Sequence, residues 1–155
     1  MAEFKLPNDL MFNRGRIEDP LAYPKERGAK SWLFIVGEEF GAMPGGMTYQ
    51  QVEQAVEHSA RIASDPPRVL NLDLAKQHVE ALDDLPRPTL VSCRTGPRAS
   101  AVAYMYAGLK ADADPEDVIR AAEKDEAPFC KFDEYKDWVR DSMKKLRFNP
   151  SAAAP

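Results

Sequence analysis

Residues 88–110, PTLVSCRTGPRASAVAYMYAGLK, determine both the fold and the chemistry expected of this chain. The run at 89–91 is short, apolar and β-favouring, which predicts a buried strand. Residues 93–98 form a small polar turn, and residues 99–109 are nearly all apolar and rich in alanine, as in a buried helix. We therefore expect a strand, a tight turn and a helix, with the turn at the start of the helix.

A turn that opens a helix in this way can bind an anion. The first backbone N–H groups of a helix have no partner within it, and the helix dipole places partial positive charge there. Cys93 ends the expected strand, where these donors would favour its thiolate over its thiol. Arg98 can hold an oxyanion through two parallel N–H groups. Gly96 permits a positive φ or a close approach of the backbone to a ligand.

The cysteine alone has a simpler interpretation. A cysteine at the end of a buried strand is usually a small core residue. Cysteine, glycine and arginine at these spacings, followed at once by a helix, favour an anion-binding loop instead. The loop by itself does not show that the chain is an active enzyme, because proteins that share a fold do not all keep the same activity.

The loop CRTGPR at 93–98 resembles the active-site loop of the Cys-dependent phosphatase and rhodanese superfamily. It is most similar to the loop of a small protein-tyrosine-phosphatase-like family related to the beta-lactamase hydrolase-like phosphatases, which reads C-R-S-G-x-R. The matching residues are Cys93, Arg94, Thr95, Gly96 and Arg98, with threonine in place of serine at 95.

This resemblance implies two-step covalent hydrolysis of a phosphoester. Thiolate Cys93 attacks phosphorus, and water then hydrolyses the cysteinyl-phosphate. The Arg98 guanidinium and the backbone N–H groups of the loop would hold the phosphoryl oxygens. The expected anion-binding residues beside Arg98 are Arg94, Thr95, Gly96 and Ala99. The implied partner is a phosphorylated substrate or another oxyanion, and we expect no cofactor and no metal.

The leaving oxygen needs a proton donor. In the superfamily an aspartate on a neighbouring loop supplies it, and Asp73 is the candidate because it follows an expected strand at 68–72. Asp73 is also explained as a plain helix N-cap, and Asp83 and Asp84 are weaker alternatives.

Two features of the loop keep other functions open. Four residues separate Cys93 from Arg98, which is one fewer than in the usual tyrosine phosphatase loop and matches single-domain rhodanese sulfurtransferases. In a sulfurtransferase, Cys93 would carry a persulfide. Ala99 stands where a serine or threonine often follows the arginine, so a hydroxyl that could assist the leaving thiolate is missing. The loop therefore also fits a catalytically weak interaction subunit of a larger complex, and whether the chain is an enzyme stays open.

Alternating strands and helices predict an α/β fold with a short, mostly parallel sheet and helices on both faces. The resemblance implies a tyrosine-phosphatase-like or rhodanese-like version of this fold. We expect an irregular N-terminal arm at 1–30, a single domain at 31–147 and a disordered tail at 148–155. The aromatic residues of the arm suggest that it covers the body of the domain or binds a protein partner. Thr48 begins a capping box, from which a helix is expected to continue to the prolines at 66–67.

Composition excludes several classes of function. The net charge is −4 and no basic run is present, which excludes a nucleic-acid surface. No apolar run is long enough to span a bilayer. His78 has no neighbouring residue at metal-ligand spacing. Two cysteines, Cys93 and Cys130, do not make a disulfide framework, so we expect a reducing compartment such as the cytoplasm or an organelle matrix.

Overall fold

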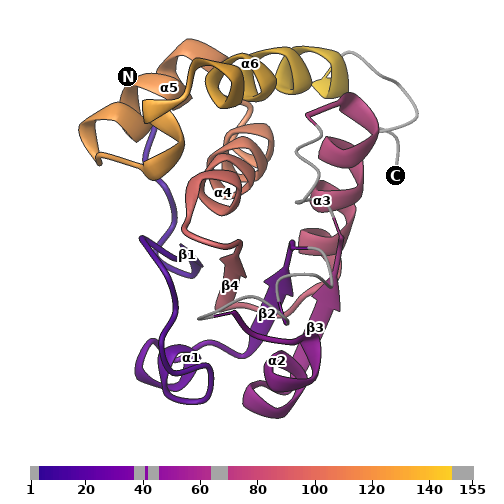
Figure 1. The fold of residues 1–155 in the computed structure, drawn as a ribbon. Coiled ribbons are helices and arrows are strands. Elements are labelled where there is room, and N and C mark those ends of the chain that lie inside the picture. Colours follow the sequence, from indigo (N-terminus) through magenta and orange to yellow (C-terminus); the bar gives the residue numbers. More distant parts are fainter. Residues whose placement is uncertain (1–3, 37–40, 42–45, 64–69, 148–155) are drawn as a thin grey trace.

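The computed structural model describes residues 4–36, 41, 46–63 and 70–147, and Figure 1 shows their arrangement. The elements along the chain are β1 (Leu10–Phe12), α1 (Ala22–Glu26), β2 (Ser31–Phe34), α2 (Tyr49–Ala55), β3 (His58–Arg61), α3 (Leu72–Asp84), β4 (Thr89–Ser92), α4 (Pro97–Lys110), α5 (Pro115–Lys124), the 3₁₀ helix η2 (Pro128–Lys131) and α6 (Asp133–Arg147).

The four strands form one parallel sheet in the order β1-β4-β2-β3. Strand β4 is central, with Leu90 opposite Met11 of β1 and Trp32 of β2. Every residue of β2 and β4 is buried, as expected for parallel strands that are covered on both faces. The predicted α/β class and parallel sheet are confirmed.

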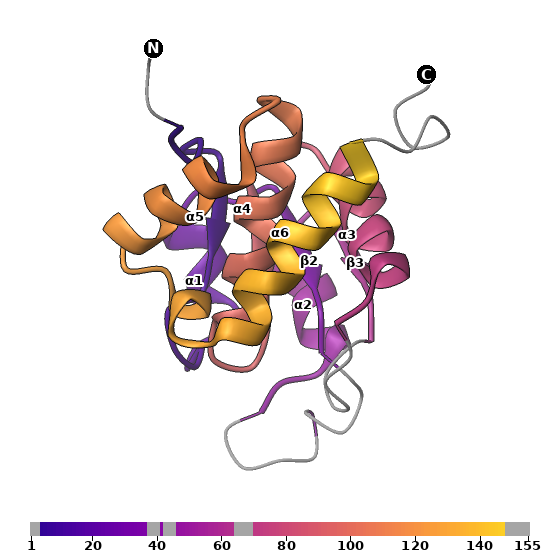
Figure 2. The ribbon, with the colours of Figure 1, turned by 90° about the horizontal axis from the view of Figure 1, so that it is seen from above.

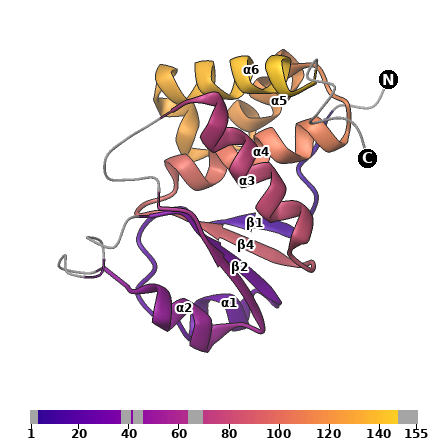
Figure 3. The same cartoon turned by 90° about the vertical axis from the view of Figure 1, so that its right-hand side faces the viewer.

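Helices cover both faces of the sheet. Figure 3 shows α1 and α2 on one face and α3 to α6 on the other. In Figure 2, α6 lies across α4, between α5 and α3. Because α4 lies between the sheet and this outer helix, its residues from Arg98 to Gly108 are all buried. A helix enclosed on all sides needs an apolar surface all round, which explains its alanine-rich sequence.

The segment after Thr48 differs from the prediction. The capping box forms, with the Thr48 side chain accepting from Gln51 N–H, but the helix ends at Ala55. Val56 adopts extended dihedrals, and residues His58–Arg61 become the edge strand β3. Val52, Val56 and Ala60 recur every four residues, a spacing typical of one helical face, but parallel pairing with β2 stabilises a strand instead. Of the strand expected at 68–72, residues 68 and 69 lie outside the described part, and Leu72 begins α3.

The N-terminal segment contributes to the domain itself. Within the expected irregular arm, residues Leu10–Phe12 form β1 and pair with β4. The rings of Phe4 and Phe12 lie 6.4 and 6.0 Å from the ring of Tyr104, so both side chains pack within the molecule. The tail expected at 148–155 lies outside the described residues. Among the helices that the structure describes, none is long and apolar enough to cross a membrane.

Candidate active site

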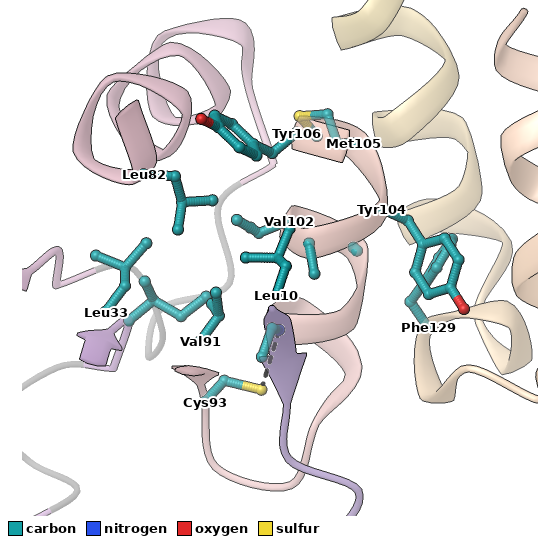
Figure 4. Packing of buried hydrophobic residues seen from close by; sticks show 14 of the residues in the cluster. Leu10, Leu33, Leu82, Val91, Cys93, Val102, Tyr104, Met105, Tyr106 and Phe129 are labelled. Atoms are coloured by element: carbon teal, nitrogen blue, oxygen red, sulfur yellow. Dashed lines mark hydrogen bonds between the residues drawn. The ribbon is translucent and has the colours of Figure 1, made fainter. Parts of the chain in front are cut away.

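The Cys loop, residues 93–98, connects the carboxyl end of β4 to the start of α4. Ligands of open parallel sheets bind at this edge. The Cys93 side chain is 3% exposed, and Figure 4 shows it among the buried residues around α4. Its Sγ accepts hydrogen bonds from the N–H groups of Gly96 at 3.1 Å and Ala99 at 3.3 Å. These two N–H groups of the loop therefore point at the sulfur.

The protonation of Cys93 differs from the expectation. Burial raises the pKa of the Cys93 thiol, and the N–H groups of Ala99, Gly96, Thr95 and Arg98 lower it by less. The donors act in the predicted direction, but burial outweighs them in the ligand-free loop, so the expected lowering of the Cys93 pKa is not found. The reason is that the sequence showed the donors but not how completely the sulfur is removed from water.

Gly96 has both properties that its position suggested. Its φ is +115°, a conformation that other residues rarely adopt. A Cβ at this position would also lie 2.3 Å from the Asn13 carbonyl oxygen. A side chain here would therefore strain the loop and push it away from the segment that follows β1.

Asn13 holds the Cys loop in place and was not predicted. This fully buried side chain follows β1, donates to the carbonyl oxygen of Cys93 and accepts from the N–H of Cys93. The neighbouring Gly15 N–H donates to the Thr95 carbonyl oxygen at 2.8 Å. A polar residue directly after a short apolar run was the available signal, but the strand at Leu10–Phe12 was not recognised.

The remaining loop residues occupy different environments. Arg98 is fully buried, and its Cζ lies 5.3 Å from the ring centre of Trp138 on α6. Ala99 is buried, Arg94 is half-buried and Thr95 is exposed. The nearest hydroxyl after Ala99 is that of Ser100, which accepts from Phe129 N–H and donates to the Pro97 carbonyl oxygen. This hydroxyl therefore ties α4 to η2.

Asp73 lies in the first turn of α3, on the exposed side of the helix. Its Oδ2 accepts from the Gln77 side chain at 3.0 Å. The N-cap is Asn71, whose side chain accepts from Leu74 N–H, so the alternative interpretation of Asp73 as the N-cap is wrong. Within the part of the chain that the structure describes, no hydrogen bond or ion pair joins the Asp73 side chain to the Cys loop.

Asp83 and Asp84 lie at the opposite end of α3, just before β4 begins. Ten residues of α-helix separate Asp73 from Asp83, about 15 Å along the axis. Asp83 accepts from the Tyr106 hydroxyl and pairs with Lys110 at 2.7 Å. Cys93 lies at the carboxyl end of β4. These two aspartates precede β4, so they lie near the amino ends of the parallel strands, on the opposite side of the sheet from the Cys loop.

The second cysteine, Cys130, lies in η2, outside the Cys loop. Cys130 is half-buried, and burial raises its pKa to about 11. Both cysteines are free thiols. Over the described ranges, no group of three or more His, Cys, Asp or Glu side chains is arranged to hold a metal ion.

Comparison with known proteins finds similarity of structure. No family model matches the sequence, and no curated protein matches it. Among solved structures, a DUF442 candidate phosphatase from Shewanella putrefaciens CN-32 superposes with a TM-score of 0.67 at 16% identity, covering 93% of this chain and 92% of that one. A candidate phosphatase from Neisseria meningitidis Z2491 gives 0.63 at 17% identity, covering 92% and 99%.

A third structure extends the comparison to a eukaryotic protein. The core catalytic domain of the PP-IP phosphatase SIW14 from S. cerevisiae gives a TM-score of 0.61 at 12% identity, covering 97% of this chain and 93% of that domain. These similarities extend over nearly the whole of each chain. The chain therefore has the same fold as these phosphatase and candidate phosphatase structures, which agrees with the fold that the resemblance of its loop implied.

Proposed function

We propose that this chain is a Cys-dependent phosphatase that hydrolyses phosphoesters through a cysteinyl-phosphate. The observation that supports this proposal best is the convergence of the loop donors on Cys93. The N–H groups of Gly96 and Ala99 contact its Sγ, and those of Thr95 and Arg98 also stabilise its negative charge. Donors arranged around a sulfur in this way can hold the oxygens of a phosphoryl group that bonds to that sulfur.

The first chemical step requires the sulfur to lose its proton. Burial keeps the Cys93 thiol protonated in the free loop, and a bound phosphate monoester dianion, whose conjugate acid has a pKa of about 6, can accept that proton. The thiolate then attacks phosphorus, so the S–P bond forms while the ester P–O bond breaks. The departing oxygen takes a proton from the phosphoryl group or from an acid such as Asp73.

The second step regenerates the enzyme. Water attacks the cysteinyl-phosphate, the S–P bond breaks, and inorganic phosphate leaves while the sulfur regains a proton. During both steps the planar Arg98 guanidinium would bind two phosphoryl oxygens together. Pro97 has no N–H, so the cradle holds one donor fewer than its length would allow. We therefore expect slow turnover.

The test compares hydrolysis of 4-nitrophenyl phosphate by the parent protein with that of Cys93→Ser and Arg98→Lys. We expect slow hydrolysis by the parent and none by Cys93→Ser, because a serine hydroxyl is not ionised near neutral pH. Arg98→Lys should be strongly impaired, since lysine keeps the charge without the paired contact. Thiosulfate-to-cyanide sulfur transfer is measured on the same preparation. Fast, Cys93-dependent sulfur transfer without hydrolysis would support the sulfurtransferase instead, and a folded protein with neither activity would support the interaction subunit.

A further inference from the structure

His78 is a buried titratable residue that the proposed mechanism does not use. It lies on α3, is fully buried, and its Nδ1 is 2.6 Å from the Leu74 carbonyl oxygen. A carbonyl oxygen only accepts hydrogen bonds, so Nδ1 must carry a proton. Burial, and then the positive charge of Arg98, lower the pKa of His78 to about 3, so the ring is neutral.

In this neutral tautomer, Nε2 carries a lone pair and can only accept a hydrogen bond. Within the described part of the chain, Nε2 is buried and has no hydrogen-bond partner. Buried acceptors in proteins are nearly always satisfied, so an acceptor in this condition needs an explanation. A group that donates hydrogen bonds is the natural partner.

The nearby donor group is the Arg98 guanidinium. His78 and Arg98 lie beside the same indole: the His78 ring meets Trp138 edge-on with ring centres 6.0 Å apart, and the Arg98 Cζ lies 5.3 Å from the same ring centre. The Trp138 ring is itself held, because its Nε1–H donates to the Asn71 carbonyl oxygen at 2.8 Å. This hydrogen bond also ties the start of α3 to α6. His78 on α3 and Arg98 on α4 therefore share one neighbour, Trp138 on α6, and the charge of Arg98 acts on the His78 ring.

We propose that His78 is a positioning residue for Arg98: when an oxyanion fills the Cys loop, the His78 Nε2 accepts a hydrogen bond from a guanidinium N–H that does not face the anion. A guanidinium has five N–H donors, and a two-point contact with an oxyanion uses two of them. An acceptor on its other edge fixes the rotation of the group, and the Trp138 face fixes its plane. The imidazole must be neutral, since an imidazolium would repel Arg98 and present no lone pair. This inference rests on the proposed function in that it takes Arg98 to be an oxyanion ligand.

Three variants of His78 test the roles of its two ring nitrogens separately. His78→Phe keeps the aromatic packing against Trp138 and removes both nitrogens. His78→Gln places an amide oxygen near the position of Nε2. His78→Asn has a shorter side chain, which can place its amide N–H near Nδ1 but has no atom at the position of Nε2. The matched control is His58→Gln, because His58 is exposed on the edge strand β3. Folding of each variant is checked by its amide NMR spectrum and its melting temperature.

The probe is inorganic phosphate, with affinity measured by protection of Cys93 from alkylation. We expect His78→Phe and His78→Asn to bind phosphate at least about tenfold more weakly than the parent, as for loss of a hydrogen bond to a charged group. His78→Gln should recover most of the affinity, which a purely structural role for the ring would not explain. The Arg98 Nε–H signal, identified by its loss in Arg98→Lys, should move in His78→Phe and return in His78→Gln.

A second measurement uses the parent protein alone and does not depend on any variant folding. The ¹⁵N signals of the His78 ring should show a protonated Nδ1 and a bare Nε2, and the Nε2 signal should shift when phosphate is added. A protonated Nε2, an unchanged Nε2 signal, or full phosphate affinity in a folded His78→Phe would each overturn the inference and leave the proposed function intact. If phosphate protects neither the parent nor Arg98→Lys, the proposed function fails and this inference fails with it.

Discussion

Asn13 and Cys93 lie 80 positions apart in the chain and are joined by two hydrogen bonds. The Asn13 Nδ2 donates to the Cys93 carbonyl oxygen at 3.1 Å, and the Cys93 N–H donates to Asn13 Oδ1 at 3.2 Å. One buried amide therefore satisfies both backbone groups of the candidate nucleophile. The edge strand β1 thus positions the Cys loop as well as completing the sheet.

We expect Asn13→Ala to destabilise the protein by about 1–3 kcal/mol, because it leaves buried backbone groups of Cys93 without partners. Urea unfolding measures the change, and Asn8→Ala, at an exposed position near the same end of the chain, is the control. Phosphate protection of Cys93 should weaken in Asn13→Ala and not in Asn8→Ala. Equal stability of the two variants would show that the amide does not hold the loop.

Gly96→Ala should prevent oxyanion binding and destabilise the fold. The new Cβ would lie 2.3 Å from the Asn13 carbonyl oxygen, in addition to the strain of a φ of +115°. Gly28→Ala is the matched control, because Gly28 also has a positive φ, +69°, but a Cβ there meets nothing within 4 Å. Gly28→Ala should lower the free energy of unfolding only by the strain of a left-handed backbone, about 1–2 kcal/mol as measured by urea unfolding. It should leave the protection of Cys93 by phosphate intact. If the two variants behave alike, steric contact with Asn13 does not matter.

Alkylation of Cys93 should be slow at neutral pH and rise steeply in alkali. Burial raises the pKa of its thiol, so below that pKa the thiolate fraction grows about tenfold for each pH unit. Iodoacetamide labelling in a Cys130→Ser background, followed by mass spectrometry from pH 6 to pH 9, measures this dependence. A labelling rate that is flat across the range would show that the loop donors outweigh burial and keep Cys93 ionised.

Gly108→Ala should destabilise the protein although alanine is the better helix former by about 1 kcal/mol. A Cβ at this position would lie 2.6 Å from Val118 Cγ2 and 2.7 Å from Met143 Cε. The methionine end can move, but the Val118 side chain on α5 is stiff, so overpacking should exceed the gain in helix propensity and cost about 1–3 kcal/mol. Thermal unfolding tests the sign, and a raised melting temperature would mean that α5 shifts freely away from α4. Gly108→Ala combined with Val118→Ala should recover part of the loss.

The sequence by itself determined the strand, turn and helix around Cys93, because these depend on local pattern. An apolar run, a glycine suited to positive φ and an alanine-rich helix are all read within a few residues of one another. The α/β class, the parallel sheet and the helices on both faces followed from the order of such segments. The positive φ of Gly96 and the position of Arg98 in the first turn of α4 follow from the same local pattern.

Only the tertiary structure decided the features that depend on pairing over long distances. Strand β3 forms where a helix was expected, because pairing with β2 outweighs the helical spacing of residues 52–60. Strand β1 is three residues long and becomes recognisable only beside β4. The proton on Cys93 depends on how completely distant side chains exclude water from the loop. The positions of Asn13 beside Cys93, and of His78 and Arg98 beside Trp138, likewise depend on contacts between segments that are far apart in the sequence. Burial and its effect on charge are properties of the assembled core, and neighbours in the sequence do not specify them.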